Sequence, residues 1–511
     1  MSVTIIEELS RIFISHADKV AVRQADSNKT YSQLKQASDS VATYLLQAGL
    51  GKGERVALLI ENSFEYIASY YGVLCAGGVV VALNTEAKAN DLSNWIKHSG
   101  STWLIASAKV SELKNVIDKC SSDINYMITG DHKQSDIADE AISRVSFDQV
   151  LNANKITQFP LLSGDDVATI IYTSGTTGKP KGVTLTHTNL LSNMQSILEY
   201  MPMSENDSCL NVLPFYYSYG NSVLHTHMMK GATLILQNSF MFPHVVLKKM
   251  QNEKVTSFYG VPSTYALLLN RTKLSEFNLS SLRYMTQAGG AMLPAHIERL
   301  REQLPDTEFI VMYGQTEATA RITYLPCEYL DQKVSSAGKP VSGVELEIRD
   351  SQNKKLPYDQ QGEIYVSGEN IMKGYWNAPD LTATVLKDGW LKTGDLARQD
   401  KDGYIYIVGR KTEMIKSGAH RISPLDIEEV LLRCAGVAEV AVIGQSDEVL
   451  GQVVKAFIVP LDKENIKKRD IQLYCKNNLA VYKIPKIIEF IDELPKTASG
   501  KLKRFALQNI H

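Results

Sequence analysis

A loop of small, hydroxyl and basic residues is the strongest chemical signal in the sequence. It follows an apolar run at 170–172, and its members are Thr173, Ser174, Gly175, Thr176, Thr177, Gly178, Lys179 and Lys181. Small residues let backbone N–H groups approach phosphates, hydroxyls add donors, and lysines add positive charge. The close glycines and Pro180 do not fit the G-x-x-x-x-G-K-[ST] loop of P-loop enzymes. The composition therefore predicts a polyphosphate site of a different kind.

A second signal is the adjacent pair Thr316 and Glu317, which combines a hydroxyl donor with a carboxylate. Magnesium prefers oxygen ligands and is usually shared between one or two carboxylates and the phosphates of a substrate. We therefore expect Thr316 to contact an α-phosphate and Glu317 to be a ligand of Mg²⁺.

With these features the sequence resembles the adenylate-forming superfamily of acyl-CoA synthetases, peptide-synthetase adenylation domains and beetle luciferases. The loop and four further stretches occur in the order typical of that family, at 313–317, 392–395, 409–410 and 495–501. The resemblance covers nearly the whole chain. It implies that the loop holds the pyrophosphate part of ATP.

The resemblance also implies roles for four charged residues. Asp395, which we place in a turn after a strand at 390–392, accepts hydrogen bonds from the ribose, and Arg410 helps to hold the same ribose or a phosphate. Lys501 reaches the site from a separate domain and neutralises charge as the acid attacks ATP, whereas Lys416 belongs to the later thioester-forming step. The remaining residues expected at the nucleotide are Gly289, Gly290, Ala291, Tyr313, Gly314 and Gln315.

Two positions depart from the family pattern. Ala419 stands where many relatives have glycine beside the path of pantetheine, and Thr412 stands at the hinge, where Asp or Lys is usual.

The stretch 214–220 bears on the acid substrate, because domains that activate α-amino acids carry an Asp there and this chain has none. An α-amino acid is therefore disfavoured. The residues expected at the acid are Tyr217, Ser218, Gly289, Met312 and Gly314. Apolar neighbours favour an elongated acid, so a fatty acid is the first candidate and an aryl acid the second; these neighbours are Val223, Leu224, Met228 and Met229.

The resemblance thus implies an AMP-forming acid:thiol ligase with ATP, Mg²⁺ and coenzyme A as cofactors. The alternative thiol is the phosphopantetheine of a carrier protein, loaded by a stand-alone adenylation enzyme. A luciferase-type oxygenase shares the motifs, and adenylation would be its first step too. A nucleotide-binding regulator without activity is disfavoured because both Glu317 and Lys501 are present.

The elements that must position these residues follow from hydrophobic spacing. Helix-period segments at 31–49 and 65–76 alternate with buried strands at 55–60 and 78–83, which predicts a parallel sheet covered by helices. Further strands are expected at 232–236, 309–312, 344–349, 362–366, 404–408 and 453–459. The predicted class is α/β: a large N-terminal domain (1–409) of layered α/β subdomains plus a β-rich subdomain, and a small mobile α+β domain (410–511).

Composition excludes several other classes of protein. The 511 residues carry a net charge of −2, so no basic surplus favours nucleic acid. None of the six cysteines forms a C-x-x-C pair, which argues against a zinc cluster and suits a reducing cytoplasm. No apolar run approaches the ~20 residues of a membrane span.

Overall fold

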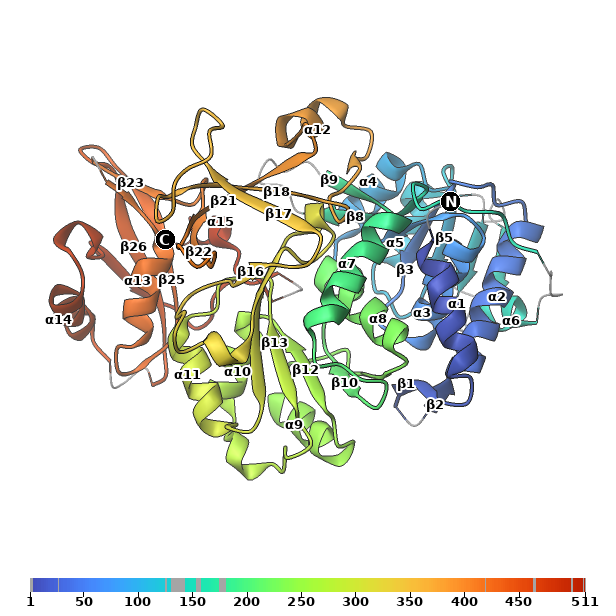
Figure 1. Cartoon of the computed structure of the whole chain (residues 1–511), viewed down its shortest axis with the longest axis horizontal. Helices are drawn as coiled ribbons and strands as arrows, with labels where there is room; N and C mark the ends of the chain where they lie inside the picture. Colours follow the sequence, from blue (N-terminus) through green and yellow to red (C-terminus); the bar gives the residue numbers. More distant parts are fainter. Residues whose placement is uncertain are drawn as a thin grey trace.

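The structure is a computed structural model, and it describes residues 3–25, 27–124, 126–129, 143–152, 158–173, 181–418, 420–462, 466–497, 500–508 and 510. These residues form four β-sheets connected by helices (Figure 1). Two large mixed sheets build most of the N-terminal part, an antiparallel sheet follows, and the C-terminal residues form the fourth. The predicted α/β class, with a large N-terminal and a small C-terminal part, is confirmed.

The first large sheet has eight strands among the described residues, in the order β19-β9-β8-β4-β3-β5-β6-β7. Strands β8 to β7 of this order are parallel, while β9 and β19 are antiparallel. The strands are β19 (Gly374–Tyr375), β9 (Lys181–Thr186), β8 (Val167–Thr173), β4 (Val79–Ala82), β3 (Arg55–Leu59), β5 (Trp103–Ala106), β6 (Tyr126–Thr129) and β7 (Ser143–Ser146). The predicted β-α-β unit is confirmed, because α3 (Phe64–Cys75) connects the parallel pair β3 and β4.

The second large sheet has nine described strands, in the order β16-β15-β14-β13-β12-β10-β11-β1-β2. They are β16 (Lys339–Pro340), β15 (Thr323–Leu325), β14 (Glu308–Tyr313), β13 (Tyr284–Gln287), β12 (Ser257–Gly260), β10 (Ser208–Asn211), β11 (Thr233–Leu236), β1 (Val20–Gln24) and β2 (Ser27–Thr30). Strands β13 and β14 are parallel, so their carboxyl ends lie at the same edge. The predicted segments 289–291 and 313–317 therefore meet there.

Helices fill the space between the two large sheets. The largest apolar cluster joins Leu9, Leu45 and Leu224 of these helices to Val80 of the first sheet and Ile310 of the second. The helices concerned are α1 (Ile5–Ser15), α2 (Tyr31–Gln47), α3, α7 (His187–Tyr200) and α8 (Ser218–Lys230). The outer helices of this part are α4 (Ala89–Ser99), α5 (Leu113–Cys120), α6 (Phe147–Leu151), α9 (Pro243–Asn252), α10 (Pro262–Arg271) and α11 (Pro294–Gln303).

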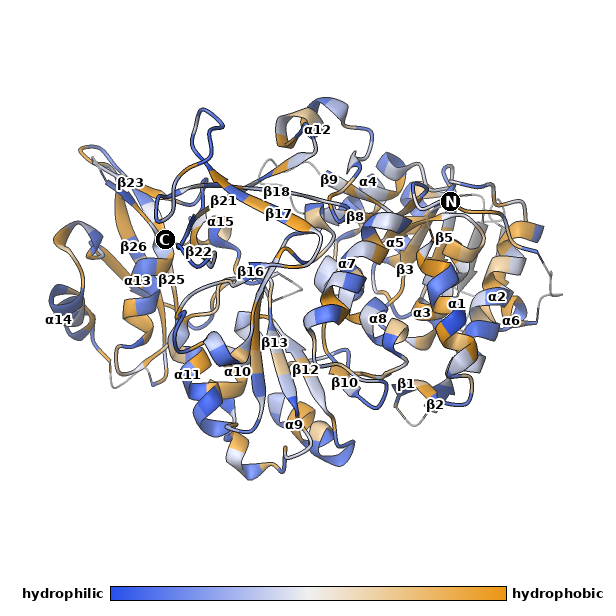
Figure 2. Ribbon diagram, viewed as in Figure 1, coloured by the Kyte–Doolittle hydropathy of each residue, from blue (hydrophilic) through white to orange (hydrophobic). Residues whose placement is uncertain are grey.

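The two smaller sheets complete the chain. The third consists of β17 (Val344–Arg349), β18 (Gly362–Gly368), β20 (Leu386–Lys387), β21 (Trp390–Gln399) and β22 (Ile405–Arg410), with α12 (Pro379–Val385) beside it. The fourth consists of β23 (Ile415–Ser417), β24 (His420–Ile422), β25 (Val437–Asp447), β26 (Gly451–Pro460) and β27 (Ile487–Phe490), with α13 (Pro424–Leu432), α14 (Lys468–Asn478) and α15 (Arg504–Leu507). Figure 2 shows α11 and α14 largely in hydrophilic colours at the outside of the molecule.

The segment that connects the last two sheets is short. Strand β22 ends at Arg410 and β23 begins at Ile415, so residues 411–414 connect them. The C-terminal sheet has an apolar cluster of its own, which includes Ile427 and Val454. Within the described residues, no helix combines the length and apolar character needed to cross a membrane.

Gly338 lies where the second and third sheets touch, since Ile405 N donates to its carbonyl at 2.9 Å. Its φ of +86° disfavours side chains, and a Cβ there would lie 1.7 Å from Tyr324 O. We expect Gly338→Ala to lower the free energy of unfolding by about 1–3 kcal/mol or more, measured by chemical denaturation. Gly51→Ala is the control, because a Cβ there meets only the Glu54 side chain at 3.5 Å. Equal stability of the two variants would contradict this account.

Candidate active site

The Asp395 carboxylate is the most deeply buried acid of the predicted site, with 4% of the residue exposed. Tyr313 donates a hydrogen bond from its hydroxyl to Asp395 Oδ2 at 2.6 Å, and Arg410 Nε lies 2.8 Å from Oδ1. Burial raises the pKa of Asp395, while the charge of Arg410 and the Tyr313 hydrogen bond act against this rise. Three predicted nucleotide residues are thus brought into direct contact.

The prediction that Asp395 lies in a turn is wrong. It lies inside β21, opposite Arg410 of β22. The preceding Gly394 adopts φ +78° without ending the strand, and Asp395 N donates to Thr393 Oγ1 at 3.1 Å. The carboxylate therefore sits on a paired strand, which holds it more rigidly than a turn.

Glu317 lies in the Thr316–Ala318 turn, which contacts β9. Tyr375 of β19 donates from its hydroxyl to Glu317 Oε1 at 2.9 Å, and Lys181 Nζ lies 5.5 Å from the centre of the Tyr375 ring. Thr173 and Lys181 are register partners at the ends of β8 and β9. The loop between them falls outside the described residues, and with it the predicted Ser174, Gly175, Thr176, Thr177, Gly178 and Lys179.

The donor set suits a nucleotide with Mg²⁺. Among the described residues no cluster of three or more His, Cys, Asp or Glu could hold a metal alone. A single carboxylate, Glu317, next to the Thr316 hydroxyl fits an ion that takes its other ligands from phosphates and water. The buried amide nitrogen Nε2 of Gln315 has no hydrogen-bond partner among the residues that the structure describes, so an acceptor on a bound nucleotide would satisfy it.

Lys501 enters this site from the C-terminal part. A Cβ on Gly289 would lie 3.1 Å from Lys501 Cε, so the missing side chain at 289 leaves room for the lysine. Solvent still reaches Lys501, yet the surrounding protein lowers the pKa of its ammonium group; the charge of Arg410 adds to this lowering, and those of Glu317 and Asp395 oppose it. The lysine thus lies in the electric field of three other predicted residues.

The C-terminal part lies beside α10 and α11 (Figure 1). A few polar contacts join it to these two helices. Ser263 Oγ donates to Gly500 O at 2.7 Å, next to Lys501. Asn270 Nδ2 donates to Ala438 O at 3.1 Å, and Arg433 forms an ion pair with Glu298 at 3.0 Å.

Lys416 is not brought to the site. It lies exposed on β23, where its backbone N–H donates to Gln452 Oε1 at 2.8 Å, and no described contact joins its side chain to the other predicted residues. Ala419 lies outside the described residues. His420 stacks on Tyr482 with ring centres 4.0 Å apart, which is a packing contact within the C-terminal part.

The residues predicted for the acid lie at the start of α8, at the end of β14 and, for Gly289, just after β13. Ser218 Oγ and Thr316 Oγ1 are 3.0 Å apart, Asn84 Nδ2 donates to the Tyr217 hydroxyl at 3.3 Å, and Tyr200 donates to Met312 Sδ at 3.2 Å. By contrast, the apolar residues taken as favouring an elongated acid belong to the core cluster or pack against it; they are Val223, Leu224, Met228 and Met229. Their apolar character is therefore explained by packing between the sheets.

Tyr375 and Ser263 were missed by the sequence analysis. Tyr375 contacts Glu317, 58 residues away in the sequence, and Ser263 contacts Gly500, 237 residues away. Neither lies in one of the recognised motifs, and no local pattern marks them.

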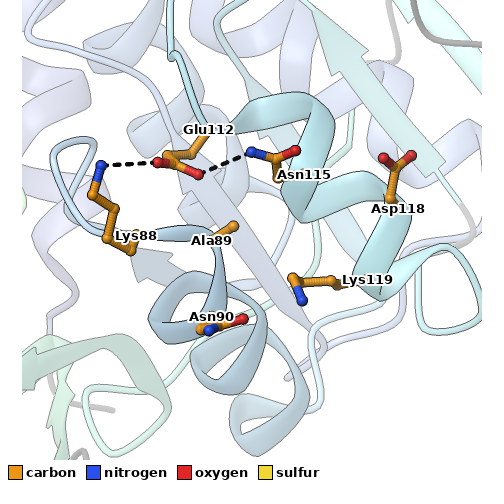
Figure 3. Close-up of a pocket in the computed structure, with 7 residues that line it drawn as sticks. All are labelled: Lys88, Ala89, Asn90, Glu112, Asn115, Asp118 and Lys119. Carbon is orange, nitrogen blue, oxygen red and sulfur yellow. Dashed lines mark hydrogen bonds and ion pairs between the residues drawn. The ribbon is translucent and has the colours of Figure 1, made fainter.

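A pocket between α4 and α5 is separate from this site (Figure 3). Its lining residues are Lys88, Ala89, Asn90, Glu112, Asn115, Asp118 and Lys119. The Glu112 carboxylate already contacts Lys88 Nζ at 3.1 Å and Asn115 Nδ2 at 3.2 Å. None of the described site residues lines this pocket, so we do not assign the chemistry to it.

The environment of Lys501 predicts the pH dependence of the step that it serves. The protonated form carries the useful charge, and its pKa is below the ordinary 10.5, so this charge is lost at a lower pH than in a free lysine. We expect the rate of adenylate formation to fall on the alkaline side below pH 10.5, measured as pyrophosphate release at saturating ATP. In Lys501→Arg the alkaline decrease in rate should occur at higher pH, because guanidinium keeps its proton. If the decrease occurs at the same pH in this variant, a group other than Lys501 causes it.

Known proteins share this architecture. The AMP-binding enzyme family model matches residues 13–376, and the model of the AMP-binding enzyme C-terminal domain matches 426–501. The chain is 34% identical to a feruloyl-CoA synthase of Amycolatopsis sp over 94% of each protein. It is 32% identical to a long-chain-fatty-acid–CoA ligase of Bacillus subtilis (strain 168), over 95% of this chain and 91% of the ligase.

Solved structures of CoA ligases have the same fold as this chain. The anthranilate CoA ligase AuaEII in complex with anthranoyl-AMP matches with a TM-score of 0.90 and 27% identity, over 99% of this chain and 96% of that one. The o-succinylbenzoate CoA synthetase of Bacillus subtilis in complex with ATP and magnesium matches with a TM-score of 0.84 and 29% identity, over 98% and 99%. The chain belongs to the adenylate-forming superfamily of AMP-binding enzymes, as an AMP-forming ligase of the acyl-CoA synthetase type.

Proposed function

We propose that the chain activates its acid in two half-reactions, performed in two orientations of the C-terminal part. The observation that carries this proposal is the position of Lys501 beside Gly289 and near Glu317 and Asp395, while Lys416 lies exposed elsewhere. The orientation described here thus has the lysine of the first step in place and the lysine of the second step away from the site.

In the first half-reaction the acid carboxylate attacks the α-phosphorus of ATP, giving acyl-AMP and pyrophosphate. Lys501 and Thr316 stabilise the charge that develops there, and Asp395 with Arg410 positions the ribose. Glu317 would hold Mg²⁺, which would supply neutralisation of the phosphate charge. In the second half-reaction the thiol attacks the acyl carbon, and AMP leaves with the electron pair of the anhydride bond.

Residues 411–414 are the proposed hinge, because Arg410 is fixed on Asp395 and the C-terminal sheet begins at Ile415. Rotation about this segment would withdraw Lys501 and bring Lys416 to the site. Such conformational steps limit turnover in many enzymes.

For the acid, we propose a fatty acid first and an aryl acid second. Both classes are named among the relatives, as long-chain fatty acids and as ferulate. For the thiol we favour coenzyme A, because the relatives that cover most of the chain are named CoA ligases. The phosphopantetheine of a carrier protein is the second candidate.

The products of ATP cleavage test the reaction type. The chain is incubated with ATP, Mg²⁺, coenzyme A and, in turn, the acids named for the relatives: ferulate, a long-chain fatty acid, 2-succinylbenzoate and anthranilate. We expect stoichiometric AMP and pyrophosphate with at least one acid, quantified by chromatography. ADP and phosphate in their place would overturn the proposal. A parallel reaction with a phosphopantetheinylated carrier protein in place of coenzyme A decides between the thiols.

Separate assays of the half-reactions test the two orientations. Lys501→Ala should slow acyl-AMP formation by about 10²–10³-fold, yet still convert supplied acyl-AMP to thioester. Lys416→Ala should show the opposite bias. Single-turnover measurements start either from acid plus ATP or from synthetic acyl-AMP plus coenzyme A. Equal impairment of both steps by Lys501→Ala would refute the two-orientation scheme.

A further inference from the structure

Arg321 is a buried charge that the functions above do not use. It is 2% exposed and lies four residues beyond Glu317, between the Thr316–Ala318 turn and β15. Its Nε is buried and has no hydrogen-bond partner among the described residues. Within the described part of the chain, no carboxylate forms an ion pair with it. Fully buried arginines are rare unless they are paired, because a charge removed from water needs compensation.

The neighbours of Arg321 orient it without neutralising it. Its backbone is clamped by Asn193, whose Oδ1 accepts from Arg321 N at 3.1 Å and whose Nδ2 donates to Arg321 O at 2.9 Å. Its guanidinium carbon lies 5.2 Å from the centre of the Tyr219 ring, and its positive charge opposes the rise that burial causes in the pKa of the Tyr200 hydroxyl. Aromatic faces and hydroxyls stabilise a cation only in part, so the guanidinium can still bind an anion.

The two tyrosines near Arg321 are next to residues expected at the acid or in contact with them. Tyr219 follows Ser218, whose hydroxyl is 3.0 Å from that of Thr316. Tyr200 donates to Met312 Sδ. A Cβ on Gly314 would lie 3.0 Å from Arg321 Cα. The backbone of Arg321 and the aromatic residue beside its guanidinium, Tyr219, are thus direct neighbours of residues expected at the acid.

We propose that Arg321 binds a second anionic group of the acid substrate, a carboxylate being the smallest that fits this chemistry. The planar guanidinium can bind a carboxylate by donating two parallel N–H···O hydrogen bonds to it. The reacting carboxylate lies at Thr316 and Lys501, and the second anion lies at Arg321. This inference rests on the proposed acid activation and narrows its substrate to a dianionic acid, of fatty or aryl type.

The wild-type enzyme provides the first test. Straight-chain monocarboxylic and dicarboxylic acids of equal length, from four to twelve carbons, are compared with benzoate and its three carboxy-substituted forms. The readout is kcat/KM for AMP release with ATP and coenzyme A. We expect the best diacid to exceed its matched monoacid at least tenfold, since a site built for a charged partner rejects the analogue that lacks it. A wild-type preference for the monoacid in every pair would overturn the inference.

Variants then assign the preference to Arg321. Arg321→Met should lower kcat/KM for the best diacid by about 10- to 100-fold, with less change for the matched monoacid, and Arg321→Lys should retain part of the diacid activity. Arg349→Met is the control: this arginine also stacks on aromatic rings, at 4.3 Å from Trp390, but it is paired with Glu347. It should leave the diacid-to-monoacid ratio unchanged.

The outcomes separate this inference from the proposed function. If monoacids release AMP and the ratio is the same in wild type, Arg321→Met and Arg321→Lys, the acid activation stands and the role of Arg321 is wrong. If Arg321→Met does not fold, Arg321→Lys provides the test. Its diacid-to-monoacid ratio of kcat/KM must then be lower than that of the wild type. If no acid of either series releases AMP, the proposed function fails and the inference falls with it.

Discussion

The buried carboxylate of Asp395 connects two of the sheets through its hydrogen bond and its ion pair. Asp395 of β21 is satisfied by Tyr313, at the end of β14 in the second large sheet, and by Arg410, at the end of β22. A buried acceptor that loses such partners costs about 1–3 kcal/mol, and more when it is charged. Two sheets and the start of the hinge segment are therefore fixed relative to one another by a single side chain, at the place where the nucleotide is expected.

Much of the candidate nucleotide site could be predicted from the sequence because its residues lie in short motifs. Glu317, Asp395 and Arg410 were identified in this way, and the structure places them around Lys501. The local backbone was harder to predict. Gly394 suggested a turn, but a glycine with positive φ also fits within a strand, and pairing with β22 decided the outcome. Tyr375 and Ser263 depend on tertiary contacts alone.

The acid end could not be predicted in the same way, for a reason specific to α8. All but three of its thirteen residues are buried, from Tyr219 to Met228. A helix that is buried all round shows no apolar stripe, so hydropathy cannot separate core positions from pocket positions. Arg321, to which we assign a role at the acid, stands outside every recognised motif. It is distinguished only by its burial without a carboxylate partner in the described part of the chain.

The contacts that hold the C-terminal part have a consequence for how solution conditions act on the enzyme. Two are single neutral hydrogen bonds, and the Arg433–Glu298 pair leaves 42% and 51% of its side chains exposed. Dissolved ions screen a pair of this kind within a Debye length of about 8 Å at physiological ionic strength. Raising the salt concentration therefore weakens this attachment while leaving the buried Asp395 cluster intact, so ionic strength acts on the balance between the two proposed orientations rather than on the nucleotide site itself.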